Sequence, residues 1–221
     1  MPTNVVAVTI NKGGAGKTML CRSLGVAAAR AGLAVLIIDM DTQQNSTSWR
    51  KRRPEEDQLP LVWFTTENDL EETLRRARIA ECDLILIDTP PGRNTEAPAA
   101  VEEADLVLIP CDATVETFEG LPRTARLARS FERPAVVVPN FVQPNSLSEE
   151  ETIRGVATAE RLETAPVALH RFIVHREGSL RGKTAQELEP NSKAAAEINA
   201  LWDWLYARLQ MTNPATVHKV A

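Results

Sequence analysis

Cysteine, aromatic side chains and long apolar runs are all scarce in this sequence of 221 residues. Its three cysteines, Cys21, Cys82 and Cys111, form no CxxC pair, which indicates buried free thiols rather than a disulfide framework or a zinc site. Apolar runs such as Val5 to Ile10 are far too short to cross a bilayer. The amino terminus also lacks the basic flank and long apolar stretch of a signal peptide. We therefore expect a cytoplasmic protein.

Acidic residues outnumber basic ones by 30 to 25, which gives a formal net charge of −5. Such a balance argues against a protein that binds nucleic acid through its bulk charge, so any DNA contact must come from a local patch. The hydrophobic and charged fractions, 43% and 25%, are typical of globular proteins. We expect a single domain over 1–210 and a flexible tail over 211–221.

Short β-branched runs alternate along the chain with longer segments of helical period. This order is typical of βαβ units and predicts an α/β fold with a doubly wound, mostly parallel sheet flanked by helices. The predicted strands lie near 5–10, 34–39, 61–65, 84–88, 106–110, 135–139 and 167–172. The predicted helices lie near 17–31, 68–80, 95–103, 118–131, 148–163 and 192–209.

A glycine-rich turn joins the first predicted strand to the first predicted helix, in the segment VVAVTINKGGAGKTML. Gly16, Lys17 and Thr18 match the end of the GxxxxGK[ST] phosphate loop, although Asn11 replaces its first glycine. Glycines let backbone N–H groups turn toward phosphate oxygens, and the helix N-terminus adds a favourable dipole. We expect bound ATP with Mg²⁺, Lys17 at the β- and γ-phosphates, and Thr18 as a Mg²⁺ ligand. The loop residues predicted to bind the nucleotide are Gly13, Gly14, Ala15, Gly16, Lys17, Thr18 and Met19.

A second lysine, Lys12, directly precedes Gly13 and makes the loop KGGAGKT. This loop resembles the deviant Walker A motif of the ParA and MinD ATPases. In that family the first lysine crosses a dimer that sandwiches ATP and contacts the partner's phosphates. The resemblance implies this catalytic role for Lys12 beside that of Lys17; the alternative is an ordinary solvated lysine. A cation supplied across the interface favours dimerisation only when the triphosphate supplies negative charge.

Two further predicted strands end in aspartates. The segment VLIIDMDTQQNS resembles the family's DxDPQxN segment, with Thr42 in place of proline, and this implies that Asp41 positions the attacking water and the metal. Asp39 has two interpretations, capping a turn or contacting Mg²⁺ through water. The segment LILIDTPPG places Asp88 at the family's Walker B position, which implies that it holds Mg²⁺ through the water shell of the ion.

Two other segments resemble family features near the nucleotide. The segment VLIPCDAT implies that Pro110 and Asp112 shape the pocket and the dimer face. Asn140, at the end of VVVPN, occupies a position where family members contact adenine, and a simple turn role is the alternative.

The segment HRFIVHREGSLRGKTAQELEPNSKAAAEI resembles the end of ParA proteins, with a strand, a loop carrying GK and a helix start. Arg171 and Lys193 fall on positions that carry DNA-contacting basic residues in the family. Basic residues without interleaved aromatics suit sequence-independent backbone binding, although a solvated loop with incidental charges is the alternative. The predicted DNA patch comprises Arg171, Arg176, Arg181, Lys183 and Lys193.

A second basic cluster, Arg50 to Arg53, is predicted to be a solvated helix end. The last helix carries an apolar stripe at helical spacing, including Ile198 and Leu205, which predicts a face packed on the core. MinD relatives end in a basic amphipathic helix that binds membrane, whereas the tail after Met211 has one lysine and little apolar mass. We therefore expect no membrane contact.

The resemblance covers nearly the whole chain and implies a ParA ATPase of the small subtype, associated with the nucleoid. Such a protein is a weak ATPase that forms a homodimer with ATP and binds non-specific double-stranded DNA. It releases the DNA after hydrolysis stimulated by a centromere-binding adaptor of ParB type. A positioning ATPase for another cargo, such as a carboxysome, a chemoreceptor array or the division site, would use the same chemistry. A reductase that bridges an iron–sulfur cluster is disfavoured because Cys82 and Cys111 lack glycine-rich surroundings.

Overall fold

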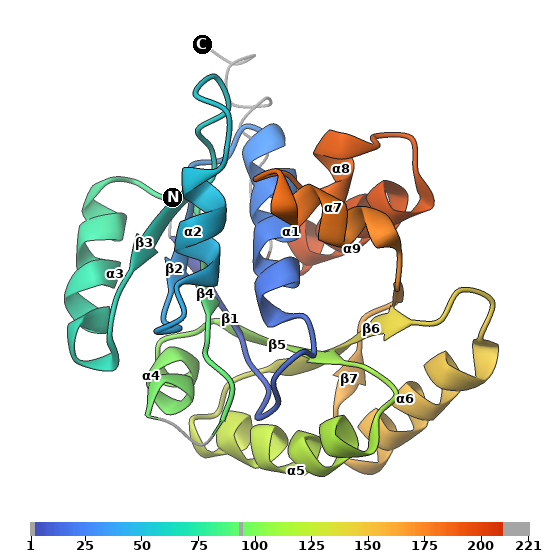
Figure 1. The fold of residues 1–221 in the computed structure, drawn as a ribbon. Helices are drawn as coiled ribbons and strands as arrows, with labels where there is room; N and C mark the ends of the chain where they lie inside the picture. The colour runs from blue at the N-terminus through green and yellow to red at the C-terminus, as the bar shows by residue number, and fades with distance from the viewer. Residues whose placement is uncertain (1–2, 93–94, 210–221) are drawn as a thin grey trace.

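The computed structural model describes residues 3–92 and 95–209, so the predicted tail over 211–221 lies outside the described residues. Within them the chain forms an eight-stranded sheet in the order β3-β2-β4-β1-β5-β6-β7, with β8 beside β6 (Figure 1). Every strand pairing is parallel. The alternation of strands and helices therefore predicted the sheet correctly.

The central strands are buried on both faces, as their runs of Val, Ile and Leu predict. All residues of β2, β4 and β5 are buried. The strands are β1 Asn4–Val8, β2 Val35–Asp39, β3 Leu61–Phe64, β4 Leu84–Asp88, β5 Leu106–Cys111, β6 Ala135–Val142, β7 Glu163–Thr164 and β8 Leu169–His170.

Helices cover both faces of the sheet, which makes the fold doubly wound (Figure 1). One apolar core contains side chains of α1 and α9, and the other contains side chains of α3, α4, α5 and α6. The helices are α1 Lys17–Arg30, α2 Asn45–Lys51, α3 Leu70–Ile79 after the short 3-10 helix η1 Glu67–Asp69, α4 Glu96–Glu102, α5 Val115–Ser130, α6 Leu147–Ala159, α7 Ile173–Leu180, α8 Ala185–Leu188 and α9 Lys193–Arg208.

The structure differs from the sequence-based expectation mainly in the carboxyl third. The predicted strand over 167–172 is wrong except for the two residues of β8, and the predicted loop carrying GK is mostly helical, as α7 and α8. Gly178 allows this compact arrangement, because a Cβ there would lie 3.1 Å from the carbonyl oxygen of Lys183. The strand β7 was also not predicted, since an element of two residues carries almost no periodic signal, and α2 was anticipated only through the helix end expected at Arg50 to Arg53.

The expectations for the cysteines and for the apolar stripe of the last helix are confirmed. The three cysteines are free and buried. Ile198, Leu201 and Leu205 of α9 are buried, and the Ser192 hydroxyl accepts a hydrogen bond from the Ala195 amide at the start of this helix. None of the helices in the described ranges has the length and apolar character that a bilayer crossing requires.

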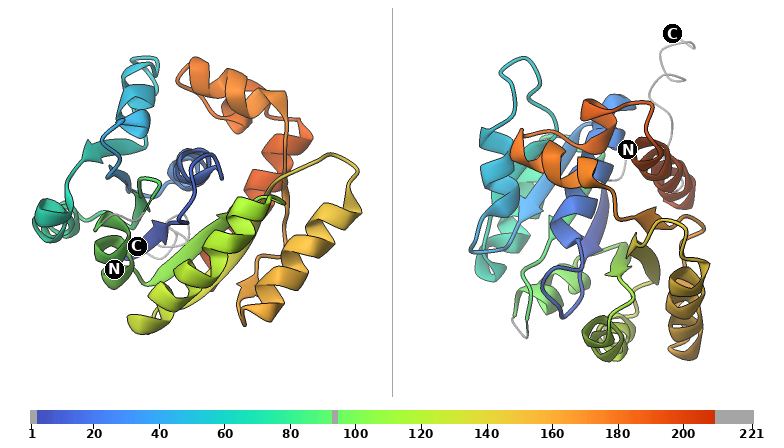
Figure 2. Two further views of the ribbon diagram at one scale, coloured as in Figure 1. Left: turned by 60° about the horizontal axis from the view of Figure 1, so that its bottom comes forward. Right: turned by 45° about the vertical axis from the view of Figure 1, so that its right-hand side comes forward.

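The carboxyl ends of the parallel strands meet at one edge of the sheet. The loop after β1 and the loop after β4 project from this edge in the right-hand view of Figure 2. Open α/β sheets bind ligands at this edge, so the local motifs predicted from the sequence converge there.

Candidate nucleotide-binding site

The phosphate loop, residues 10–16, connects β1 to α1 and depends on two glycines in the left-handed region. Gly14 has φ +82° and Gly16 has φ +92°. Residues other than glycine rarely adopt such positive φ angles. A Cβ on Gly16 would lie 2.1 Å from Nδ2 of Asn140, whereas one on Gly14 would meet nothing within 4 Å. The loop is therefore packed against β6 on one side and open on the other.

Lys17, the first residue of α1, is buried, and its ammonium lies within the loop. Its Nζ donates hydrogen bonds to the carbonyl oxygens of Lys12, at 2.7 Å, and Ile10, at 3.2 Å. Burial lowers the pKa of Lys17, and the nearby Asp88 and Asp41 carboxylates partly oppose this change. The ammonium is thus held by backbone carbonyls at the centre of a loop whose geometry suits phosphate.

Asp88 ends β4 and is fully buried among hydroxyl groups. Thr18 Oγ1 donates to one carboxylate oxygen at 3.2 Å, and Ser46 Oγ donates to the other at 2.8 Å. Burial, together with the neighbouring Asp39 carboxylate, raises the pKa of Asp88 to about 6, although the hydrogen bonds from Ser46 and Thr18 oppose the change. Sequence reasoning missed Ser46; the signal available was the hydroxyl-rich run Ser46 to Ser48, which begins a few residues after Asp41.

Asp39 and Asp41 use their carboxylates differently. Asp39 Oδ2 accepts hydrogen bonds from the amide and the hydroxyl of Thr47, at 2.8 and 2.9 Å, and Oδ1 accepts one from the Asp41 amide. These contacts at α2 favour the turn interpretation of Asp39. Asp41 Oδ1 accepts one hydrogen bond, from the Gln43 amide at 2.9 Å, and lies near enough to Lys17 to affect its pKa.

Lys12 is held by side chains of its own chain, contrary to the picture of an ordinary solvated lysine. Its Nζ lies 3.1 Å from both carboxylate oxygens of Asp112 and donates to Thr114 Oγ1 at 2.6 Å. Burial raises the pKa of Asp112, but hydrogen bonds from Thr117, Thr114 and Lys12 outweigh it and leave the pKa lowered. The loop is thereby tied to the residues that follow β5.

Asn140 lies within β6, so the simple turn interpretation of this residue is wrong. Its Nδ2 donates to the carbonyl oxygen of Ala15 at 2.7 Å, while its buried Oδ1 has no hydrogen-bond partner among the described residues. A cavity of about 750 Å³ opens beside the loop, lined by Gly14, Met19, Phe141 and residues of α7. An unpaired acceptor near an apolar cavity suits a purine base, whose amino group donates hydrogen bonds.

The residues at this edge fit ATP with Mg²⁺. The open side of the loop, a buried ammonium and hydroxyl donors beside carboxylates match the requirements of a triphosphate and a hard cation. Within 3–92 and 95–209, no group of three or more His, Cys, Asp and Glu side chains is placed to hold a metal ion. A Mg²⁺ ion there would depend on phosphate and water ligands, as is usual for nucleotide sites.

The predicted DNA patch is spread over several elements. Arg171 and Lys193 border a common cavity of about 510 Å³ and are both exposed. The Arg171 guanidinium also lies 5.5 Å from the centre of the Phe141 ring. Arg176 lies on α7, and Arg181 and Lys183 lie on the turn between α7 and α8. None of these five side chains forms an ion pair with another described residue.

The prediction of a solvated helix end at Arg50 to Arg53 is wrong for Arg53. Its side chain is buried, with Nη2 2.6 Å from Glu187 and 2.8 Å from Asp57. Its guanidinium lies 4.7 Å from the centre of the Trp49 ring. Lys51 and Arg52 are exposed, as predicted.

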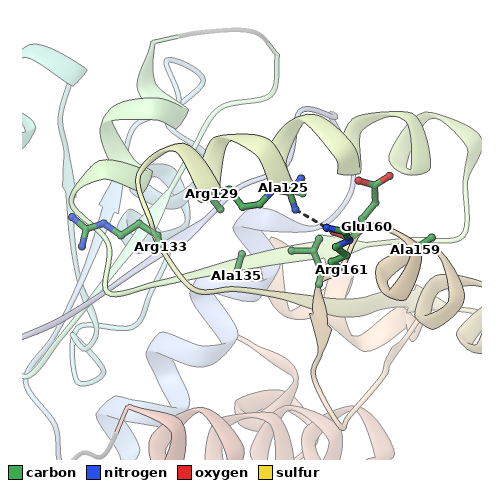
Figure 3. Close-up of a pocket in the computed structure, with 9 residues that line it drawn as sticks. Ala125, Arg129, Arg133, Ala135, Ala159, Glu160 and Arg161 are labelled. Atoms are coloured by element: carbon green, nitrogen blue, oxygen red, sulfur yellow. Dashed lines mark hydrogen bonds between the residues drawn. The ribbon is translucent and has the colours of Figure 1, made fainter.

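A further cavity, of about 410 Å³, lies at the opposite edge of the sheet between the carboxyl ends of α5 and α6 (Figure 3). Arg129 donates there to the carbonyl oxygen of Glu160 at 3.2 Å. Cations near helix carboxyl ends are stabilised by the helix dipole, which accounts for the arginines at this edge.

Residues 6–178 match the family model described as the CobQ/CobB/MinD/ParA nucleotide binding domain. The chain belongs to this family. It therefore carries the ATPase domain of the ParA and MinD proteins, as the resemblance of its phosphate loop implied. The chain is 28% identical to the probable plasmid-partitioning protein ParA of Thermus thermophilus, over 89% of this chain and 76% of that protein. It is 30% identical to the maintenance of carboxysome distribution protein A of Gloeobacter kilaueensis, over 87% of this chain and 92% of that protein.

Solved structures of the family share the fold. The MinD cell division protein of Aquifex aeolicus has a TM-score of 0.75 over 93% of this chain and 97% of that chain, at 21% identity. The septum site-determining protein MinD of Pyrococcus horikoshii, solved in complex with Mg-ADP, has a TM-score of 0.72 over 92% of this chain and 96% of that chain at 19% identity. These likenesses confirm the α/β fold.

Proposed function

We propose that this ParA-family ATPase is a DNA partition protein that forms a homodimer with ATP, binds non-specific duplex DNA and releases it after hydrolysis. The observation that carries the proposal is the second lysine of the phosphate loop. Lys12 lies at the carboxyl edge of the sheet, in an ion pair with Asp112 that a negatively charged triphosphate can compete with. Nucleotide state would then control dimerisation.

Exposed apolar side chains support a dimer face at the same edge. Val115, Leu147 and Ile173 are 68%, 76% and 68% exposed, and they begin α5, α6 and α7 directly after strands of the sheet. Large apolar side chains exposed at one edge of a sheet are consistent with a surface that becomes covered in a complex. A second subunit facing this edge would bury them and bring its own Lys12 toward the nucleotide.

Each residue of the site has a defined task in this proposal. Lys17 and the loop amides would bind the β- and γ-phosphates. Thr18 would ligate Mg²⁺, Asp88 would hold its hydration shell, and Asp41 would position the attacking water and the metal. Bound Mg²⁺ would neutralise charge on the phosphates. Asn140 supports the loop through Ala15 and offers Oδ1 to the adenine amino group.

The proposed association with the nucleoid follows from the basic residues of the carboxyl third. Cations that lack ion-pair partners suit phosphate backbone, which would place the ATP-bound protein on the nucleoid. An adaptor of ParB type that binds a centromere would stimulate hydrolysis and link the ATPase to its cargo. A carboxysome is the second candidate cargo, because the match to the 30% identical carboxysome distribution protein covers 92% of that protein.

The test is retention of the full chain on non-specific duplex DNA without nucleotide, with ADP, and with a slowly hydrolysed ATP analogue, each at two salt concentrations. We expect retention only with the ATP analogue, and less of it at the higher salt concentration. Equal retention in all three nucleotide states would show that ATP does not control DNA binding. If the protein forms an ATP-dependent dimer but binds no DNA, it would instead be a positioning ATPase that does not use the nucleoid.

A further inference from the structure

Two basic clusters that are far apart in the sequence lie side by side in the structure. Arg52, at the end of α2, donates from Nη2 to the carbonyl oxygen of Ser179 at 3.2 Å. A Cβ on Gly182 would lie 2.4 Å from the carbonyl carbon of Arg52, so the two backbones are in direct contact. In Figure 1 one end of α7 reaches α2 across α1. The second cluster of the sequence analysis therefore adjoins part of the predicted DNA patch.

Buried contacts hold the two segments together. Arg53 Nη1 donates to the carbonyl oxygen of Gly182 at 3.0 Å, while Nη2 pairs with Glu187 at 2.6 Å. Trp49 Nε1 donates to the carbonyl oxygen of Lys183 at 3.1 Å. Because these groups are buried and bonded to one another, they hold the backbone segments that carry the exposed cations next to each other.

The exposed cations of this region lack ion-pair partners among the described residues. Asp57 and Glu187, two of the nearby carboxylates, are already paired with Arg53. Glu55 and Glu56, exposed on the loop after α2, and Glu177 on α7 add some negative charge. Burial and the Arg53 charge lower the pKa of Arg50, as expected where cations crowd together. The α2–α7 surface comprises Arg50, Lys51, Arg52, Arg176, Arg181 and Lys183.

We propose that the α2–α7 surface is a single binding site for the phosphate backbone of duplex DNA, to which Arg50, Lys51 and Arg52 contribute beside the residues of α7. This inference rests on the proposed function and assigns part of its DNA contact to α2. Six cations on a rigid support can contact several phosphates at once, whereas a base-reading or single-strand site would need groove-entering or stacking side chains. Each lost phosphate contact reduces the slope of log affinity against log salt by about 0.9.

The test compares two full-length variants that remove the same charge. The first carries Arg50→Gln, Lys51→Gln and Arg52→Gln on α2. The matched control carries Arg75→Gln, Arg76→Gln and Arg78→Gln, three exposed arginines on α3, which packs elsewhere on the sheet. Affinity for a labelled non-specific duplex is measured by fluorescence anisotropy with the ATP analogue over a salt series, and light scattering checks that each variant still forms the ATP dimer.

We expect the α2 variant to bind at least about 10-fold more weakly and to lose about two to three units of salt slope, while the α3 variant stays near wild type. The single change Lys51→Glu, at an exposed side chain, should weaken binding in the same direction even if the triple variant folds poorly. Wild-type affinity of both α2 variants would overturn the inference. If the wild-type protein binds no DNA in any nucleotide state, the DNA part of the proposed function is overturned instead. If that protein binds anionic phospholipid vesicles and no DNA, the surface is a membrane-binding site.

Discussion

Lys12 and Asp112 form an ion pair within one chain, with the Lys12 ammonium 3.1 Å from each carboxylate oxygen. Thr114 strengthens this arrangement by accepting from the same ammonium at 2.6 Å. A lysine that serves the partner's phosphates must leave these contacts. In the proposed dimer the pair would therefore oppose dimerisation until a bound triphosphate attracts the Lys12 ammonium more strongly than Asp112 does.

Replacing Lys12 should separate nucleotide binding from dimerisation. We expect Lys12→Ala to bind a fluorescent ATP analogue but to remain monomeric in light scattering, because Lys17 and the loop amides are intact. Lys17→Ala is the comparison and should lose both properties, since Lys17 is the buried ammonium at the centre of the loop. An ATP dimer of Lys12→Ala with wild-type affinity would rule out the cross-subunit role.

Asp88 should make the protein without nucleotide and metal less stable as the pH rises. The pKa of Asp88 is about 6 in the folded protein against an ordinary value of 3.8, so between these values the folded state binds more protons than the unfolded state. Stability contributed by this group is therefore lost as pH rises through that window, by on the order of 3 kcal/mol above pH 6.

Asp88→Asn should consequently raise the free energy of unfolding at pH 7.5 and have less effect at pH 4, while removing Mg²⁺-dependent hydrolysis. Urea denaturation of variant and wild type at both pH values measures the difference. The same stabilisation at both pH values would show that ionisation of Asp88 is not its source.

Asn140 should support nucleotide affinity through the loop. We expect Asn140→Ala to weaken ATP binding by roughly 10-fold, the order of one lost hydrogen bond, because the Ala15 carbonyl loses its donor. Asn140→Asp should also weaken binding, since an ionised carboxylate has the right size but no N–H to donate. Titration calorimetry gives both affinities, and an unchanged value for Asn140→Ala would contradict this support.

Replacing Arg53 should lower the stability of the protein far more than replacing an exposed arginine. We expect Arg53→Ala to cost about 3–5 kcal/mol, because Glu187 would be left as a buried carboxylate with no cation beside it. The control Arg75→Ala removes an equally short pair with Glu72, but both of those side chains are exposed and little change in stability should follow. Chemical denaturation of the two variants compares them, and equal effects would argue against the buried pair.

Most of the nucleotide site was predictable because its parts are contiguous in the sequence. The strand, the glycine turn and the helix that begins at Lys17 follow one another within a short segment, and Asp41 and Asp88 follow apolar strands. The contacts of Ser46 with Asp88 and of Asn140 with Ala15 were not predictable in the same way. They join residues from different strands and loops, and neither has a spacing that identifies its partner.

By itself, the amino-acid sequence determined the α/β class, the phosphate loop and the family, because alternating apolar periods and a local glycine motif need no distant partner. Only the tertiary structure decided the pairing of Lys12 with Asp112, the burial of Arg53 and the position of α2 beside α7. Those relationships depend on how separate strands and helices pack, and an exposed and a buried arginine look alike in a sequence. Packing also made one surface of two basic clusters that stand far apart along the chain.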